Sequence, residues 1–315
     1  MNDPEKSLLV EALDKHWNIY YAKLKLTRRE FSREAVDDLR VALRHLLPVI
    51  EMLRTIAPEP QLQKFYKTLK DLLDAMEELR DIQVSQVEFS EAINEFPKAR
   101  PFLTYLEKRE DRLLRKMERR VHQLKPGNLI KHASTIRRSI VGLYATRPEI
   151  TRLLLEAVDD AFILVQNRYE VLDQAKPAGI HRLRVAMRKF RYRLEIVNPV
   201  LADFSPEILE RLHDLQDSLG YLKDIEILLG YLDEFTSKDP SFGPGPVRRY
   251  FQDLHKEAED ALFEHLPDVR SFWYASHSDS FPWHLVQDQS ESILPPAVSS
   301  PTDTNTYESG TNAQT

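Results

Sequence analysis

The feature that most constrains the fold is a pair of segments that occurs twice, in the same order and at nearly the same spacing. Residues 34–53 align with residues 178–197 at an offset of 144, and residues 69–82 align with residues 212–225 at an offset of 143. Chance similarity between helices is the alternative, but charged residues match as well as apolar ones. In the first pair the matches are Leu39, Arg40, Val41, Ala42, Arg44 and Glu51 with Leu183, Arg184, Val185, Ala186, Arg188 and Glu195. The repeat indicates one duplicated unit of about four helices.

Apolar residues recur at spacings of three and four in most windows, and the chain has only eight glycines in 315 residues. This pattern predicts an all-α protein. We expect two four-helix-bundle-like halves related by a pseudo-twofold axis, with the first half at about 5–145 and the second at about 146–275. The expected helices lie near 5–26, 33–56, 61–94, 100–124, 129–145, 148–174, 179–198, 206–235 and 247–266.

Residues that break helices, mainly proline and glycine, support these boundaries. Pro126-Gly127-Asn128 is expected to separate the fourth and fifth helices, and the loop Ser237–Pro246 contains three prolines and two glycines. Beyond Arg270 the chain has no Lys or Arg and becomes rich in Ser, Thr, Asn and Pro. Residues 276–315 are therefore expected to form a polar, disordered tail.

Composition excludes several classes of site. The chain has no cysteine, no apolar run long enough to span a membrane and no signal peptide, so we expect a cytoplasmic protein. We find no catalytic set, no P-loop and no metal site, and expect no cofactor. Glu210 and His213 have the Glu-x-x-His spacing of di-iron bundles, but the second pair that such a site needs is absent.

The segment 179–197 concentrates positive charge in a chain whose formal net charge is -6. At about 100° per residue, one face carries His181, Arg184, Arg188, Arg191 and Glu195 beside the apolar stripe. An outer strip of Arg182, Lys189 and Arg193 lies roughly opposite that stripe and is expected to face solvent. The inner arginines need acceptors. Aspartates of the next helix could supply some, but the excess of cations favours a bound polyanion: polyphosphate, nucleic acid or acidic protein.

Two motifs resemble the signatures of the CHAD family, the conserved histidine α-helical domain: IHRLRVAMRKFRYRLE (residues 180–195) and LQDSLGYLKDIEIL (residues 215–228). The resemblance extends over roughly residues 5–275, and we expect a CHAD domain at 1–275. It implies two four-helix bundles around a central basic surface, binding of inorganic polyphosphate, and location at bacterial polyphosphate granules. Granule-associated proteins are further candidate partners. The expected polyphosphate-binding residues are Arg40, Arg44, His181, Arg184, Arg188, Lys189 and Arg191.

The first half departs from the family pattern. Asp37 stands where the family has its histidine, and Leu47 stands where the second half has Arg191. Either affinity is lower or the ligand sits toward the second half. An alternative function is a helical protein-interaction scaffold that has lost its ligand. A nucleic-acid binder is a weaker alternative, because basic stretches interleaved with exposed aromatics are missing. The family's frequent partner, a triphosphatase domain with a Glu-x-Glu-x-Lys motif, has no counterpart here, so hydrolysis of the polymer is unsupported.

Overall fold

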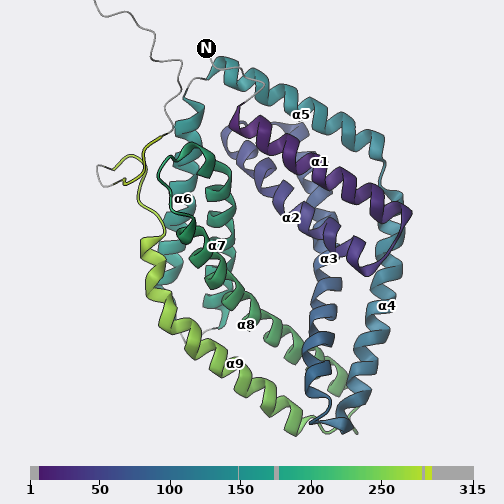
Figure 1. Ribbon diagram of the computed structural model, residues 1–315. Coiled ribbons are helices and arrows are strands. Elements are labelled where there is room, and N and C mark those ends of the chain that lie inside the picture. Colours follow the sequence, from purple (N-terminus) through teal and green to yellow (C-terminus); the bar gives the residue numbers. More distant parts are fainter. Residues whose placement is uncertain (1–6, 148, 174–176, 279–280, 286–315) are drawn as a thin grey trace, which may run out of the picture.

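The computed structural model describes residues 7–147, 149–173, 177–278 and 281–285 (Figure 1). Within these residues the fold is all-α, as predicted, with nine α-helices and a few short 3-10 turns. Each expected helix is present, with ends shifted by at most a few residues. The helices are α1 (Leu8–Arg29), α2 (Arg33–Ile56), α3 (Pro60–Ala92), α4 (Arg100–Gln123), α5 (Pro126–Thr146), α6 (Ile150–Glu170), α7 (Pro177–Val197), α8 (Pro206–Lys238) and α9 (Gly245–His265).

Two predicted loops are shorter than expected. Pro126 opens α5 instead of preceding it, because proline in the first helical turn has no hydrogen bond to lose and its fixed φ suits a helix. The segment expected to be a loop at 237–246 is partly helical, since α8 continues to Lys238 and α9 begins at Gly245. The turn between the two helices is closed by Asp239, whose carboxylate accepts hydrogen bonds from Ser241.

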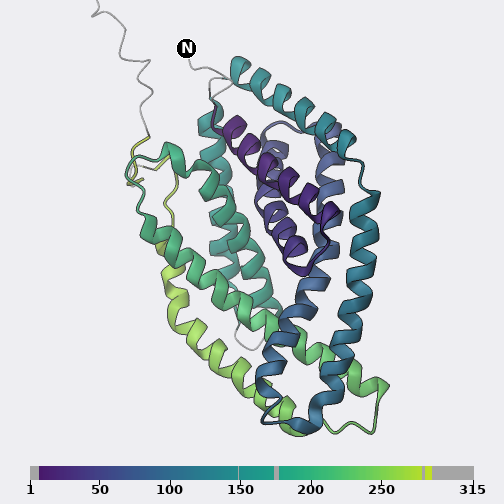
Figure 2. The same cartoon turned by 45° about the vertical axis from the view of Figure 1, so that its right-hand side comes forward.

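Helices that follow one another in sequence pack side by side. Contacts join α1 to α2, α2 to α3 and α3 to α4, and likewise α6 to α7, α7 to α8 and α8 to α9. Helix α5 lies along the outer edge and packs on α1 and α3 (Figures 1 and 2). The two groups meet where α2 packs on α7 and where α3 packs on α8. The repeated segments of the sequence therefore lie at the contact between the two groups of helices.

Two hydrophobic clusters hold the helices together, and each contains residues from both groups. The larger one surrounds α2 and α7. The smaller one fills the space around the far ends of α3 and α8, which have 33 residues each and so are about 50 Å long. The smaller cluster contains four buried phenylalanines, of which Phe89 and Phe102 meet edge to face with ring centroids 4.8 Å apart. None of the described helices has both the length and the apolar character that a membrane span needs.

Part of the segment expected to be a disordered tail packs on the helices. The indole of Trp283 stacks on Trp273 with ring centroids 4.9 Å apart, and the backbone N–H of Ser276 donates to the buried carboxylate of Asp159. Residue 276 is therefore too early a start for the expected tail, because Phe281 and Trp283 pack on Trp273 despite the polar composition around them. Residues 286–315 lie outside the described residues.

Candidate functional site

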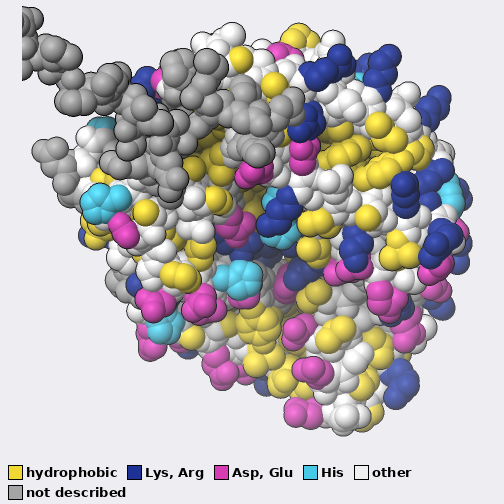
Figure 3. Space-filling model, turned by 45° about the horizontal axis from the view of Figure 1, so that its top comes forward, with side chains coloured by type: hydrophobic (Ala, Val, Ile, Leu, Met, Phe, Trp, Pro, Cys, Tyr) yellow, Lys and Arg dark blue, Asp and Glu magenta, His cyan; other side chains and the backbone are white. Residues whose placement is uncertain are grey.

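A cavity of about 340 Å³ opens between α2, α7, α8 and one turn of α3. Five arginines and two histidines line it: Arg44, Arg80, Arg184, Arg188, Arg191, His45 and His213. In the space-filling view, Lys, Arg and His side chains gather in and around a hollow near the middle of the face shown (Figure 3). Two carboxylates, Asp217 and Asp224, complete the charged lining. The cavity is therefore predominantly cationic, which favours an anionic ligand.

Arg184 and Arg188 are the cations of this cavity without a protein partner. Neither guanidinium has a carboxylate or hydrogen-bond acceptor within contact distance among the described residues, although both side chains are partly buried. Burial lowers the pKa of Arg184, and the neighbouring charges of Arg188 and Arg44 lower it further. Partly buried guanidinium groups that repel one another are unfavourable unless an anion compensates them.

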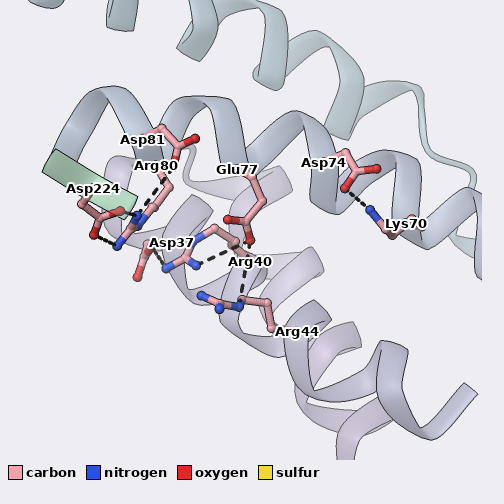
Figure 4. Close-up of polar contacts among 9 residues, drawn as sticks. All are labelled: Asp37, Arg40, Arg44, Lys70, Asp74, Glu77, Arg80, Asp81 and Asp224. Carbon is pink, nitrogen blue, oxygen red and sulfur yellow. Dashed lines mark hydrogen bonds and ion pairs between the residues drawn. The ribbon is translucent and has the colours of Figure 1, made fainter. Parts of the chain in front are cut away.

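Arg40 and Arg44, the counterparts of this pair on α2, have different surroundings (Figure 4). Arg40 is only 8% exposed, and its Nε and Nη2 donate to Asp37 Oδ1 at 3.0 and 2.6 Å. It does not line the cavity. Arg44 does line the cavity, and its only ion pair in the described structure is a 4.0 Å contact to Glu77. Asp37 thus neutralises Arg40, whereas Arg44 remains accessible to a ligand.

Arg191 reaches the cavity but already has protein partners. Its guanidinium lies 3.3 Å from Glu195 Oε1 and donates to the Nδ1 of His213. Burial raises the pKa of Glu195, which the charge of Arg191 partly offsets. Since Arg191 is 8% exposed, its first role is to position His213 and to compensate Glu195.

Arg80 and Asp224 form a bidentate ion pair where α3 crosses α8 (Figure 4). Burial alone would lower the pKa of Arg80, but the hydrogen bonds and charge of Asp224 outweigh it, and the pKa is raised. Burial raises the pKa of neighbouring Asp81, against the effect of Arg80. The repeated aspartates therefore do supply part of an Arg/Asp network, and they satisfy Arg80 rather than Arg184 or Arg188.

The remaining expected residues lie at the edges. His181 is exposed and is not part of the cavity lining, and its pKa is lowered by burial and by the nearby charges of Lys223 and Arg184. Lys189 lines a second cavity of about 300 Å³ that shares Arg44 and Arg188 with the first, and its Nζ lies 3.3 Å from Glu51. This second cavity contains three carboxylates, Glu51, Asp74 and Glu77, so its positive charge is more fully compensated than that of the first cavity, which contains two.

The outer strip of α7 does not uniformly face solvent. Arg182 is exposed as expected, but Arg193 is 5% exposed and donates to the backbone oxygen of Ala157 on α6 and to Thr55 Oγ1 on α2. The expectation for Arg193 was wrong because α7 is enclosed on several sides by α1, α2, α6 and α8. A helical wheel with one apolar stripe cannot show that enclosure.

Sequence reasoning did not assign several lining residues to the site, among them Arg80, His45, Tyr192, His213 and Gln216. The Nε2 of Gln216 is buried without a hydrogen-bond partner. His45 stacks on His16 with ring centroids 5.7 Å apart, and it meets the edge of Tyr192. His45 could have been found, because it aligns with Lys189 in the repeat. In the described residues, no cluster of His, Asp and Glu has the arrangement of a metal site.

Comparison with known proteins gives the following matches. A family model described as the CHAD domain matches residues 11–233 and 158–279. A crystal structure of the CHAD domain from the plant Ricinus communis matches with a TM-score of 0.66 at 14% sequence identity, covering 87% of this chain and 92% of that chain. At this identity the structural likeness shows a shared fold. No curated protein matches the sequence.

Proposed function

The chain belongs to the CHAD domain family, and from this and the geometry of its basic cavity we propose that it binds inorganic polyphosphate. The observation that carries the proposal is the pair Arg184 and Arg188, which line the cavity and have no acceptor among the described residues. All other arginines of the lining have at least one carboxylate at ion-pair distance within the described residues. Phosphate oxygens are the acceptors that best match two guanidinium forks.

The spacing of the pair fits a chain of phosphates. Arg184 and Arg188 are one helical turn apart, which places successive guanidinium groups about 5–6 Å from one another along α7. Arg44 lines the same cavity from α2, and a phosphate can readily replace its weak 4.0 Å contact with Glu77. Three cations from two helices would therefore surround one segment of polymer, and each charged hydrogen bond would stabilise it by roughly 1.5–3 kcal/mol.

The duplication explains why the cavity has cations on two sides. We propose that α2 and α7 are equivalent helices of two four-helix halves related by a pseudo-twofold axis, with halves near 5–145 and 146–275. In that arrangement Arg44 and Arg188 are symmetry mates. The symmetry of charge is broken because Asp37 holds Arg40, so the polymer would sit toward the second half. Binding at polyphosphate granules is the location we propose for this activity.

The proposal is one of binding without turnover. The description of the matched family model names no enzymatic activity. The cavity contains two carboxylates, and one of them, Asp224, is held by Arg80. These groups are oriented toward structural ion pairs rather than toward a bound phosphate, so we assign them no catalytic role.

Titration calorimetry with tripolyphosphate and with long-chain polyphosphate tests the proposal, with single-stranded DNA as competitor at matched salt. We expect saturable binding of both phosphates, weakening as salt rises, by analogy with other polyanions. We expect DNA to compete only at much higher charge concentration. Absence of binding by either phosphate would favour the alternative in which the domain is a protein-interaction scaffold.

A further inference from the structure

A second basic surface lies far from the cavity along the sequence. Between residues 112 and 147 the chain has ten Lys and Arg residues and a single acid, Glu118. This stretch covers the second half of α4 and all of α5, whereas the whole chain has a formal net charge of -6. The net positive charge of helices α1 to α5 is therefore concentrated in the second half of α4 and in α5.

Eight of these cations are exposed. Seven of them form what we call the outer ridge: Arg112, Arg115, Lys116, Arg119, Lys125, Lys131 and Arg138. None of the seven has a carboxylate partner within the described part of the chain. The hydrogen bonds that Arg112 and Arg138 make go to their own helices. The other three basic residues have protein partners: Arg120 donates to the backbone oxygen of Asp71, Arg137 pairs with Asp14, and Arg147 donates to the backbone oxygen of Ile56.

Within each of the two helices, residues of the ridge share one face. On α4 the positions 112, 116 and 119 follow the i, i+4, i+7 spacing of one face, and 131 and 138 do so on α5. Figures 1 and 2 both place α4 and α5 on the outer edge of the molecule, and dark blue side chains are frequent on that side in Figure 3. Arg28 of α1 fixes the corner between them, because its Nη1 donates to the oxygens of Val121, His122 and Leu124.

We propose that the outer ridge is a second polyanion-binding surface that takes a further segment of a long polyphosphate chain, or a second chain. This inference relies on the proposed function only for the choice of ligand. A thin, flexible anion suits the ridge better than single-stranded nucleic acid. Within 112–147 the one Phe, Trp or Tyr is Tyr144, whose hydroxyl accepts from the backbone of Leu9, so no free ring is available for base stacking.

The two basic surfaces are separated by a compensated strip on α3. There Lys70 pairs with Asp74, and Glu77 lies 4.0 Å from both Arg40 and Arg44. A polymer would gain little along this strip, so the surfaces act as two sites joined by the ligand rather than as one long groove. Two sites allow one molecule to hold two chains, or two segments of one chain, with a gain in avidity.

The test uses the full chain and two variants that each remove two exposed charges. R115Q/R119Q changes the ridge, and R249Q/K256Q changes exposed cations on α9 as a matched control. We expect R115Q/R119Q to weaken binding of long-chain polyphosphate by roughly tenfold and to abolish the light scattering that cross-linked chains produce. Binding of tripolyphosphate, which is short enough for the cavity, should stay unchanged in both variants.

An equal effect of the two double variants on long-chain binding would overturn the proposal, because diffuse charge would then suffice. Displacement of long-chain polyphosphate from the ridge by duplex DNA at lower charge concentration would reassign the surface to nucleic acid. If the proposed function of the cavity is wrong but the ridge proposal is right, tripolyphosphate will not bind, while R115Q/R119Q will still weaken binding of long-chain polyphosphate.

Discussion

Helices α2 and α7 carry the same arginines at equivalent positions, yet only α7 leaves both of them available to a ligand. Three residues before the first arginine, α2 has Asp37 and α7 has His181. Asp37 binds Arg40 through two hydrogen bonds, and Arg40 is not part of the cavity lining, whereas Arg184 lines the cavity and has no partner among the residues that the structure describes. The residue one turn upstream therefore distinguishes an arginine that is paired within its own helix from one that lines the cavity.

A second sequence difference between the two helices places a histidine of α2 in the cavity. His45 follows Arg44 on α2 at the position where Lys189 follows Arg188 on α7. Each helix therefore has one histidine, but at a different place, and only His45 lines the cavity. Helix α2 therefore has a titratable side chain where α7 has a lysine, so the two helices should respond differently to pH.

The strongest test of this comparison removes the unpaired arginines. We expect R184Q/R188Q to weaken polyphosphate binding by roughly 1–3 kcal/mol per residue, the range for losing a charged hydrogen bond. Glutamine keeps helix propensity and most of the stem, so the circular dichroism spectrum should be unchanged. Titration of tripolyphosphate measures the loss. R182Q, which changes an exposed arginine of the same helix, is the control and should have little effect. An intact affinity in the folded double variant would remove the main support for the site.

Arg40 should behave differently from its counterpart. R40Q breaks a hydrogen-bonded pair with Asp37, which is half exposed, so we expect a modest loss of unfolding free energy of about 1 kcal/mol. Affinity for tripolyphosphate should change by less than that of R184Q. Chemical denaturation and titration of the same samples separate the two effects. Equal losses of affinity in R40Q and R184Q would show that Asp37 does not withdraw Arg40 from the ligand.

Exchanging the residues at the position one turn before the first arginine should make the contributions of α2 and α7 to binding more alike. H181D places a carboxylate one turn before Arg184 and should lower affinity by about 1 kcal/mol, because the new pair competes with the ligand. D37H frees Arg40 and should raise affinity by a smaller amount, at some cost in stability since Arg40 stays buried. Titration and melting temperature of both variants measure these changes. A gain in affinity for H181D would contradict the comparison.

Much of the fold could be read from the sequence because the helical period and the repeat carry it. The nine helices and the excess of cations on α7 were predictable from spacing alone. The pairing of Arg80 with Asp224 was not, because it depends on where α3 crosses α8. Arg193 was misassigned because enclosure of α7 by several helices leaves no trace in a single apolar stripe. The ion pair between Arg40 and Asp37 could have been predicted, since Asp37 is three residues before Arg40 on the same helix face.

The smallest expected effect is the pH dependence of binding. Burial, with the charge of Arg191 next, lowers the pKa of His45, and burial with Lys223 and Arg184 lowers that of His181. A bound polyanion opposes these effects and raises both pKa values, so binding takes up protons. Affinity should therefore rise as pH falls from about 8 toward 6, by less than tenfold per pH unit for each proton taken up.

The useful pH range is limited by the fold itself. Burial, followed by the charges of His45 and Lys15, lowers the pKa of His16 to about 4. Between its unfolded value of about 6.5 and this value, the unfolded chain binds more protons than the folded one, so stability is lost as pH falls through that window. Because His16 is only partly buried, solvent screening should limit the loss to about 1–2 kcal/mol. Titrations between pH 6 and 8 avoid most of it. In that range H45Q/H181Q should bind tripolyphosphate with a flatter pH profile than the native protein, whereas an unchanged profile would assign the pH dependence to the phosphate groups of the ligand.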